Sequence, residues 1–165
     1  MVEASFSPGP RLKIVSGGQT GVDQGALEAA LELGLEHGGW CPRGRLSEAG
    51  PIPACFRLRE TESAEYWVRT EQNVINSDAT LIFYRRQIRG GTALTKRMAI
   101  KHGRPYRCLD LNRSPASQSV RKWLKDQAIG VLNVAGPRES WCPGIQNQTR
   151  RFLLDVFRYQ ETSVE

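Results

Sequence analysis

Three glycine-containing segments hold the residues of this sequence that are best suited to bind an anionic ligand. They are Ser16-Gly17-Gly18-Gln19-Thr20-Gly21, Gly90-Gly91-Thr92 and Ala135-Gly136-Pro137-Arg138-Glu139-Ser140. Each follows a short apolar run typical of a strand, and the first two precede a helical pattern. Glycine lets the backbone approach an anion closely, and a helix N-terminus offers unpaired N–H groups. Together the segments predict a site for a phosphate or similar oxyanion, although each one alone could be an ordinary strand-to-helix turn.

Charged residues near these segments extend the candidate site. Arg43 and Arg45 flank a glycine in a long loop and could fold over the ligand, or could simply keep that loop soluble. Asp23, Glu71 and Glu139 are carboxylates that could pair with ring N–H groups, bind a ribose hydroxyl or act as a general base. Asp23 could equally stabilise the first turn of a helix through the helix dipole. The tryptophans that could stack on a planar ring, or pack in a core or lid, are Trp40, Trp67 and Trp141.

One helix contributes a further polar pair. Arg69 and Asn73 are four residues apart, so they share one face of the predicted helix. An ordinary solvated helix face explains the pair as well as a role in a site does.

Strand-like and helix-like patterns alternate along the 165 residues, which predicts one α/β domain with a mostly parallel sheet and helices on both faces. Because parallel strands end at one edge of such a sheet, the three glycine segments should meet there. We expect residues 1–10 and 161–165 to be frayed. The expected elements are strands over Arg11–Val15, Ala79–Tyr84, Pro105–Leu111 and Gly130–Val134, helices over Val22–Leu33, Glu65–Asn76, Gly90–Lys101, Ser119–Gln127 and Asn147–Tyr159, and an ordered loop over Glu36–Ala64 with one short strand near Trp40.

Positive charge is concentrated in the middle of the chain. The net charge is +6, but residues 85–125 contain twelve Lys and Arg against one acid, Asp110. Such a block favours an anionic partner, or else forms a solvated helix face. Nucleic acid is disfavoured because we expect no exposed aromatic residues interleaved with the basic ones and no known nucleic-acid module occurs. A phosphorylated small molecule is the expected ligand.

The cysteines do not indicate a metal site. Cys41, Cys55, Cys108 and Cys142 form no C-x-x-C pair, so no structural metal is expected. The first residues lack a basic leader followed by a long apolar segment, and no apolar run approaches the length of a membrane span. We therefore expect a cytoplasmic protein with reduced thiols and no membrane association.

Several stretches resemble one known family. SGGQTGVDQGALEAALELG, GGWCPRGR, GPIP, RTEQNVINSDATLIFY, GGTALT and LNVAGPRES occur in this order between Lys13 and Leu154. This pattern resembles the molybdenum carrier family, a circularly permuted branch of the SLOG superfamily that also holds the LOG-type phosphoribohydrolases. The resemblance implies a Rossmann-like domain, a nucleotide-type or pterin-phosphate ligand and a homo-oligomer, dimeric or tetrameric. Some family members are regarded as carriers of molybdenum cofactor, or molybdopterin.

The chain departs from the family pattern at two places. Gln24 stands where the family usually has an Arg, and Ser47-Glu48-Ala49-Gly50 stands where it usually has Ala-Glu-Asp-Gly. The residues that we expect to hold the ligand are Gly17, Gly18, Gln19, Thr20, Gly21, Asp23, Arg43, Arg45, Gly90, Gly91, Thr92, Gly136, Pro137, Arg138, Glu139 and Ser140.

Two functions compete for this site. The first is a carrier that binds a phosphorylated pterin such as molybdenum cofactor without converting it. The second is a nucleotide-processing enzyme that cleaves an N-glycosidic bond, as LOG relatives do, or a nucleotide-sensing module. LOG-type enzymes resemble one another in a stretch that ends in a glutamate, and Thr95 stands at that position here. Because threonine is no general acid near neutral pH, the sequence favours the carrier unless Glu71 or Asp23 takes over.

Overall fold

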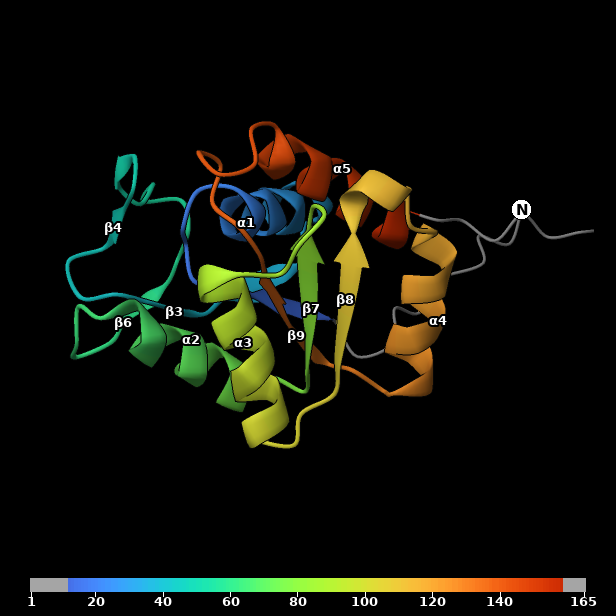
Figure 1. Cartoon of the computed structure of the whole chain (residues 1–165), viewed down its shortest axis with the longest axis horizontal. Helices are drawn as coiled ribbons and strands as arrows, with labels where there is room; N and C mark the ends of the chain where they lie inside the picture. Colours follow the sequence, from blue (N-terminus) through green and yellow to red (C-terminus); the bar gives the residue numbers. More distant parts are fainter. Residues whose placement is uncertain (1–11, 159–165) are drawn as a thin grey trace, which may run out of the picture.

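The central element of the fold is a five-stranded parallel sheet with helices on both faces (Figure 1). The computed structural model describes residues 12–158, so the expected fraying of residues 1–10 and 161–165 lies outside the described residues. The strands run in the order β2 (Glu36–Gly38), β1 (Lys13–Val15), β9 (Val131–Ala135), β7 (Ala79–Tyr84) and β8 (Tyr106–Asp110). Every pairing within this sheet is parallel. The predicted α/β fold is confirmed.

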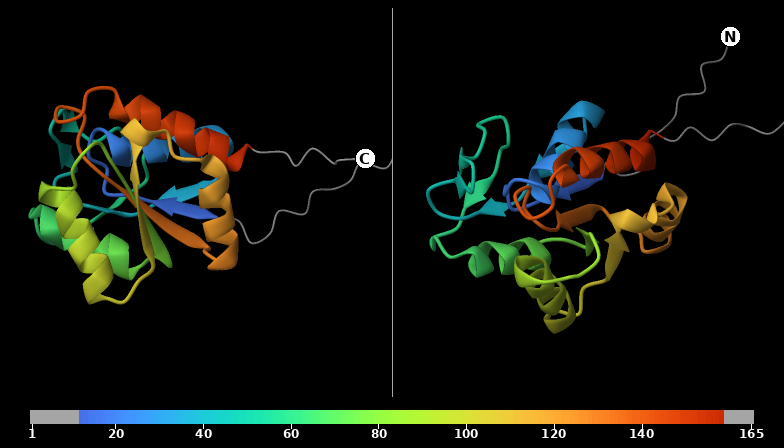
Figure 2. Two further views of the ribbon diagram at one scale, coloured as in Figure 1. Left: turned by 45° about the vertical axis from the view of Figure 1, so that its right-hand side comes forward. Right: turned by 45° about the horizontal axis from the view of Figure 1, so that its top comes forward.

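Helices form the two outer layers. On one face, α1 (Val22–Leu33) packs against α5 (Ile145–Phe157), which also contacts α4 (Ser117–Asp126). On the other face, α2 (Tyr66–Ile75) packs against α3 (Gly90–Lys101), as Figure 2 shows from two sides. A short 3-10 turn, η1 (Leu111–Arg113), follows β8. None of the helices within residues 12–158 combines the length and apolarity that a membrane span needs.

The core lies between the sheet and the α1–α5 layer. Its fully buried members include Ile14 of β1, Phe83 of β7 and Leu132 of β9. On α5, Leu153 and Val156 are buried in this cluster, and their neighbours Phe152 and Phe157 pack against it, as the helical spacing predicts. The apolar periodicity of the sequence therefore identifies the buried face of α5 correctly.

The long segment between α1 and α2 contains more regular structure than the sequence predicts. The short strand expected near Trp40 is β3 (Trp40–Cys41), which pairs in parallel with β6 (Arg59–Glu60). The prediction missed β2, because Glu36-His37-Gly38 has little intrinsic strand preference. Parallel pairing with β1 makes this tripeptide the edge strand of the sheet. The prediction also missed the hairpin of β4 (Leu46–Ser47) and β5 (Gly50–Pro51).

A second, smaller apolar cluster fixes this long segment to the domain. It joins Leu27 of α1 to Cys41, Ile52 and Phe56, with Leu58 packed against it. The segment is therefore an ordered part of the molecule that rests on α1, next to the edge of the sheet where the strands end.

The close approach of α1 and α5 gives a test of the fold. A Cβ atom at Gly25 would lie 2.3 Å from the backbone oxygen of Gln146, so Gly25→Ala must push the two helices apart. We expect a loss of about 1–3 kcal/mol in the free energy of unfolding, although alanine favours an isolated helix. Urea denaturation measures this, and an unchanged or increased stability would contradict the described packing.

Candidate functional site

The three glycine segments meet at one edge of the sheet, as predicted, around a cleft with two adjacent lobes. The inner lobe has a volume of about 220 Å³ and is lined by residues of all three segments, among them Gln19, Gly91 and Gly136. The arginine lobe has a volume of about 640 Å³, and Arg85, Arg86 and Arg89 contribute to its wall. Thr92, Pro137 and Trp141 line both lobes, so the two lobes lie next to each other.

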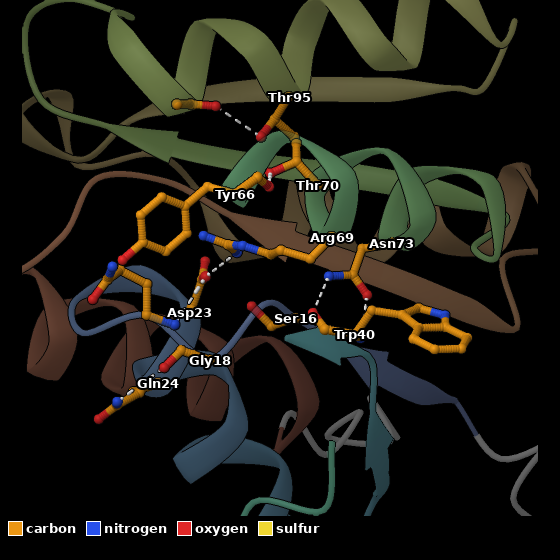
Figure 3. A network of polar contacts seen from close by, with 12 residues as sticks. Ser16, Gly18, Asp23, Gln24, Trp40, Tyr66, Arg69, Thr70, Asn73 and Thr95 are labelled. Carbon is orange, nitrogen blue, oxygen red and sulfur yellow. Dashed lines mark hydrogen bonds and ion pairs between the residues drawn. The ribbon is translucent and has the colours of Figure 1, made fainter. Parts of the chain in front are cut away.

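A buried ion pair lies at the base of the inner lobe (Figure 3). Nη1 of Arg69 donates to Oδ2 of Asp23 at 2.9 Å, and the backbone N–H of Gln19 donates to the same oxygen at 3.2 Å. The side chains of Asp23 and Arg69 are only 4% and 14% exposed. Burial raises the pKa of Asp23, while the charge and hydrogen bond of Arg69 lower it. Arg69 is thus the cation that makes a buried carboxylate tolerable here.

The same arginine closes the first glycine segment. A Cβ atom at Gly17 would lie 1.5 Å from Nη1 of Arg69, and one at Gly18 would lie 2.8 Å from the side chain of Ile52. At the start of α1, Gln146 Oε1 accepts from the N–H of Gly21 at 2.9 Å. The glycines of this segment therefore make room for protein atoms, and they do not line either lobe.

Gln19 is the member of the first segment that faces the cleft. It is 6% exposed, and its Oε1 accepts from the N–H groups of Thr20 and Glu48 at 3.0 and 2.9 Å. Its Nε2 is buried and has no hydrogen-bond partner among residues 12–158. Because a buried unpaired donor is costly, this amide is poised to donate to a ligand in the inner lobe.

The second glycine segment is open, in contrast to the first. It forms the first turn of α3, where no side chain of the described part of the chain caps the helix, so the N–H groups of Gly90, Gly91 and Thr92 are available. A Cβ atom at Gly91 would meet nothing within 4 Å, and Gly91 lines the inner lobe. The positive end of a helix therefore faces the cleft without a protein partner.

The third glycine segment contributes a cation between two aromatic rings. The guanidinium of Arg138 lies 4.9 Å from the ring centroid of Trp141 and 5.9 Å from that of Tyr66, in the range of cation–π contacts. Both aromatic side chains line the inner lobe although they are about half exposed. Gly136 is needed for packing, because a Cβ atom there would lie 2.5 Å from the backbone oxygen of Phe83.

Glu48, at the tip of the β4–β5 hairpin, joins the first and third segments and was missed by the sequence analysis. Its carboxylate accepts hydrogen bonds from the hydroxyls of Thr20 and Ser140 and from the N–H of Ser140, and it lies 3.9 Å from Arg138. Burial alone would raise the pKa of Glu48, but the hydrogen bonds from Ser140 and Thr20 lower it. The departure from the family pattern at residues 47–50 marks this stretch, but the sequence does not show what it contacts.

Two of the predicted ligand residues, Glu139 and Arg45, have structural partners of their own, and a third, Arg43, lies outside the cleft. The carboxylate of Glu139 accepts from the N–H groups of Gly144 and Gln146, so it caps α5. Arg45 donates to the backbone oxygens of Leu58, Pro53 and Phe56 within the long segment. Arg43 is exposed. Neither Arg43 nor Arg45 lines the inner lobe or the arginine lobe.

The remaining candidates divide between the cleft and the far end of α2. Asn73 is committed to structure, since its amide pairs with the backbone N–H and C=O of Trp40 at 2.8 and 2.9 Å (Figure 3). Glu71 pairs with Lys101 at 3.2 Å and does not line the cleft. Asp23 does line the inner lobe, as does Thr95, whose hydroxyl donates to the backbone oxygen of Gly91. Residues 12–158 contain no group of three or more His, Cys, Asp or Glu side chains able to hold a metal ion.

Comparison with known proteins agrees with this fold. The model of the circularly permutated YpsA SLOG family matches residues 14–157. The chain is also similar to a solved structure from Syntrophus aciditrophicus SB, that of a protein named "Putative molybdenum carrier protein". The two sequences are 37% identical, the match covers 93% of this chain and 99% of the other, and the TM-score is 0.85. No curated protein matches the chain.

The buried ion pair gives a pH-dependent prediction. Arg69→Gln removes the cation that lowers the pKa of Asp23, so that pKa rises further above its ordinary value of 3.8. At neutral pH the variant should lose about 3–5 kcal/mol, the usual cost of breaking a buried pair. In the folded variant, the carboxyl group of Asp23 therefore binds its proton more tightly than it does in the unfolded chain. The loss in the free energy of unfolding should be smallest below about pH 4 and should grow as the pH rises.

Denaturation of wild type and variant between pH 4 and pH 7 measures this. The control is the double variant Asp23→Asn/Arg69→Gln, which carries neither charge and should lack the pH dependence. A loss that is the same at both ends of the range in Arg69→Gln would contradict the role given to the pair.

Proposed function

The chain belongs to the circularly permutated YpsA SLOG family, and from that premise we propose that it binds and carries a phosphorylated pterin-type ligand such as molybdenum cofactor. The observation that carries the proposal is the buried, unpartnered Nε2 of Gln19 in the same lobe as the uncapped first turn of α3. The amide of Gln19 suits a neutral acceptor on a ring, and the N–H groups of the first turn of α3 suit an anion. A molecule with a heteroaromatic ring and a phosphate has both features.

The first turn of α3 supports the anionic half of the proposal. Its free N–H groups and the positive end of the helix dipole favour a phosphate. Arg138 lines the same lobe and would add a charge-assisted hydrogen bond, with Tyr66 and Trp141 holding its guanidinium.

The walls of the inner lobe support the ring half of the proposal. Trp141 and Tyr66 offer half-exposed aromatic faces on which a planar ring can stack. Gln19 would donate to a ring carbonyl or nitrogen, and Asp23 offers carboxylate oxygens to ring N–H groups. A pterin ring carries donors and acceptors of both kinds along its edge.

The side chains at the possible catalytic positions favour carriage of the ligand over its chemical conversion. Thr95 stands at the position where LOG-type enzymes have a glutamate, and its hydroxyl donates a hydrogen bond to the backbone oxygen of Gly91 at 3.0 Å. Glu71, a possible substitute, lies against Lys101 and outside the cleft. Asp23 is the remaining substitute, and its Oδ2 already accepts from Arg69 and Gln19. The name of the similar protein from Syntrophus aciditrophicus SB agrees with a molybdenum-related cargo.

Gly91→Ala tests the proposal because it separates binding from stability. The added methyl group meets no protein atom but stands in the inner lobe, at the N–H groups proposed to hold the phosphate. We expect thermal stability to be unchanged or slightly higher, since alanine favours a helix by up to about 1 kcal/mol. We expect the amount of phosphorylated pterin that copurifies under anaerobic conditions to fall at least about tenfold, as mass spectrometry can measure.

The matched control is Gly130→Ala, just before β9 and outside both lobes, where a Cβ atom makes only an ordinary contact at 3.4 Å with Asp78. This variant should retain the ligand. Wild-type protein that carries no phosphorylated pterin, or a Gly91→Ala variant that carries as much as wild type, would contradict the proposal.

A further inference from the structure

The arginine lobe is larger than a single phosphate requires. Its volume of about 640 Å³ lies within the range of about 300–1,000 Å³ found for small-molecule sites, whereas the inner lobe, at about 220 Å³, falls below that range. A pterin ring in the inner lobe and one phosphate at α3 would leave the arginine lobe without an occupant. Since Thr92, Pro137 and Trp141 line both lobes, a longer ligand can extend from one into the other.

One arginine of this lobe is part of its framework. The guanidinium of Arg85 donates to Oε1 of Gln148 at 2.7 and 3.0 Å and to the backbone oxygen of Pro143 at 2.7 Å. Its position is therefore fixed by α5 and by the loop before that helix. It adds positive charge to the wall, but three of its five N–H donors already bind protein oxygens.

The other two arginines are free to bind. The side chains of Arg86 and Arg89 make no hydrogen bond or ion pair with any residue between 12 and 158, and both residues are exposed. The neighbouring acid, Asp110, accepts from the backbone N–H groups of Arg86 and Asn112 and lies 3.8 Å from Arg113. Arg86 also holds a left-handed backbone conformation, with φ of 66°. Such strain in a residue with a side chain is typical of functional sites.

Chain connectivity places these cations beside the proposed phosphate position. Arg89 directly precedes the first turn of α3 and is its N-cap residue. A phosphoryl group at the N–H groups of Gly91 and Thr92 therefore has the arginine lobe next to it. A second phosphoryl group joined to the first through one bridging oxygen would meet two guanidinium groups, which match phosphate oxygens in a bidentate manner.

We propose that the arginine lobe is a second phosphate subsite, so that the cleft takes ligands with a diphosphate group, either pyrophosphate itself or a diphosphate ester. The inference rests on the proposed function in so far as both use the first turn of α3. It adds that one phosphoryl group binds at that turn and the other binds Arg86 and Arg89.

Titration calorimetry with inorganic phosphate and inorganic pyrophosphate tests the subsite. Wild type should bind pyrophosphate at least about tenfold more tightly than phosphate, as expected for added charge-assisted hydrogen bonds. The double variant Arg86→Ala/Arg89→Ala should lose this preference while its affinity for phosphate changes less than about twofold. The matched control is Arg97→Ala/Arg151→Ala, which removes the same charge from exposed positions on α3 and α5 outside the cleft and should keep the preference.

Titration with AMP and ADP distinguishes the two sources of the diphosphate. A preference for ADP that Arg86→Ala/Arg89→Ala removes assigns the subsite to diphosphate esters, and a preference confined to pyrophosphate assigns it to the free anion. Equal binding of phosphate and pyrophosphate by wild type, or an equal loss in both double variants, would overturn the subsite. These results are independent of whether a pterin copurifies, so the subsite and the carrier function can fail separately.

Discussion

The ion pair between Asp23 and Arg69 is the constraint on which the candidate site depends. It joins the first turn of α1 to the middle of α2, across the end of β1, and places a cation beside a carboxyl group that is almost fully buried. To reach Asp23, the guanidinium crosses the backbone at Gly17 so closely that no side chain fits there. The first glycine segment is thus shaped by a protein cation that already covers it.

Closure of the first segment is the reason that we propose the second as the anion site. At the start of α1, the N–H groups of Gly21 and Val22 donate to Gln146 and Pro137. At the start of α5, the carboxylate of Glu139 accepts from the N–H groups of Gly144 and Gln146. Of these three helices, α3 begins in the cleft without an acceptor from any residue between 12 and 158. Similar glycine segments therefore differ in their surroundings, since close packing requires glycine at Gly21 and Gly136, whereas a Cβ atom at Gly91 would meet nothing within 4 Å.

Apolar periodicity predicted the sheet, its helices and the edge where the glycine segments meet, because those features depend on local patterns. It missed β2, since Glu36-His37-Gly38 becomes a strand only through pairing with β1. Site residues were harder to predict because glycine is needed equally where a ligand approaches and where a side chain crosses. Arg69 looked like part of a solvated helix, and Glu48 like a loop acid, until the fold brought them to Asp23 and Ser140.

The position of a bound anion tests this account most directly. Crystals of the protein soaked in selenate, a phosphate analogue with an anomalous signal, would locate it without assumptions about the native ligand. We predict the anomalous peak at the first turn of α3, within hydrogen-bond distance of the N–H groups of Gly91 and Thr92. A peak at the backbone of residues 17–21 instead, with Arg69 moved away from Gly17, would contradict it.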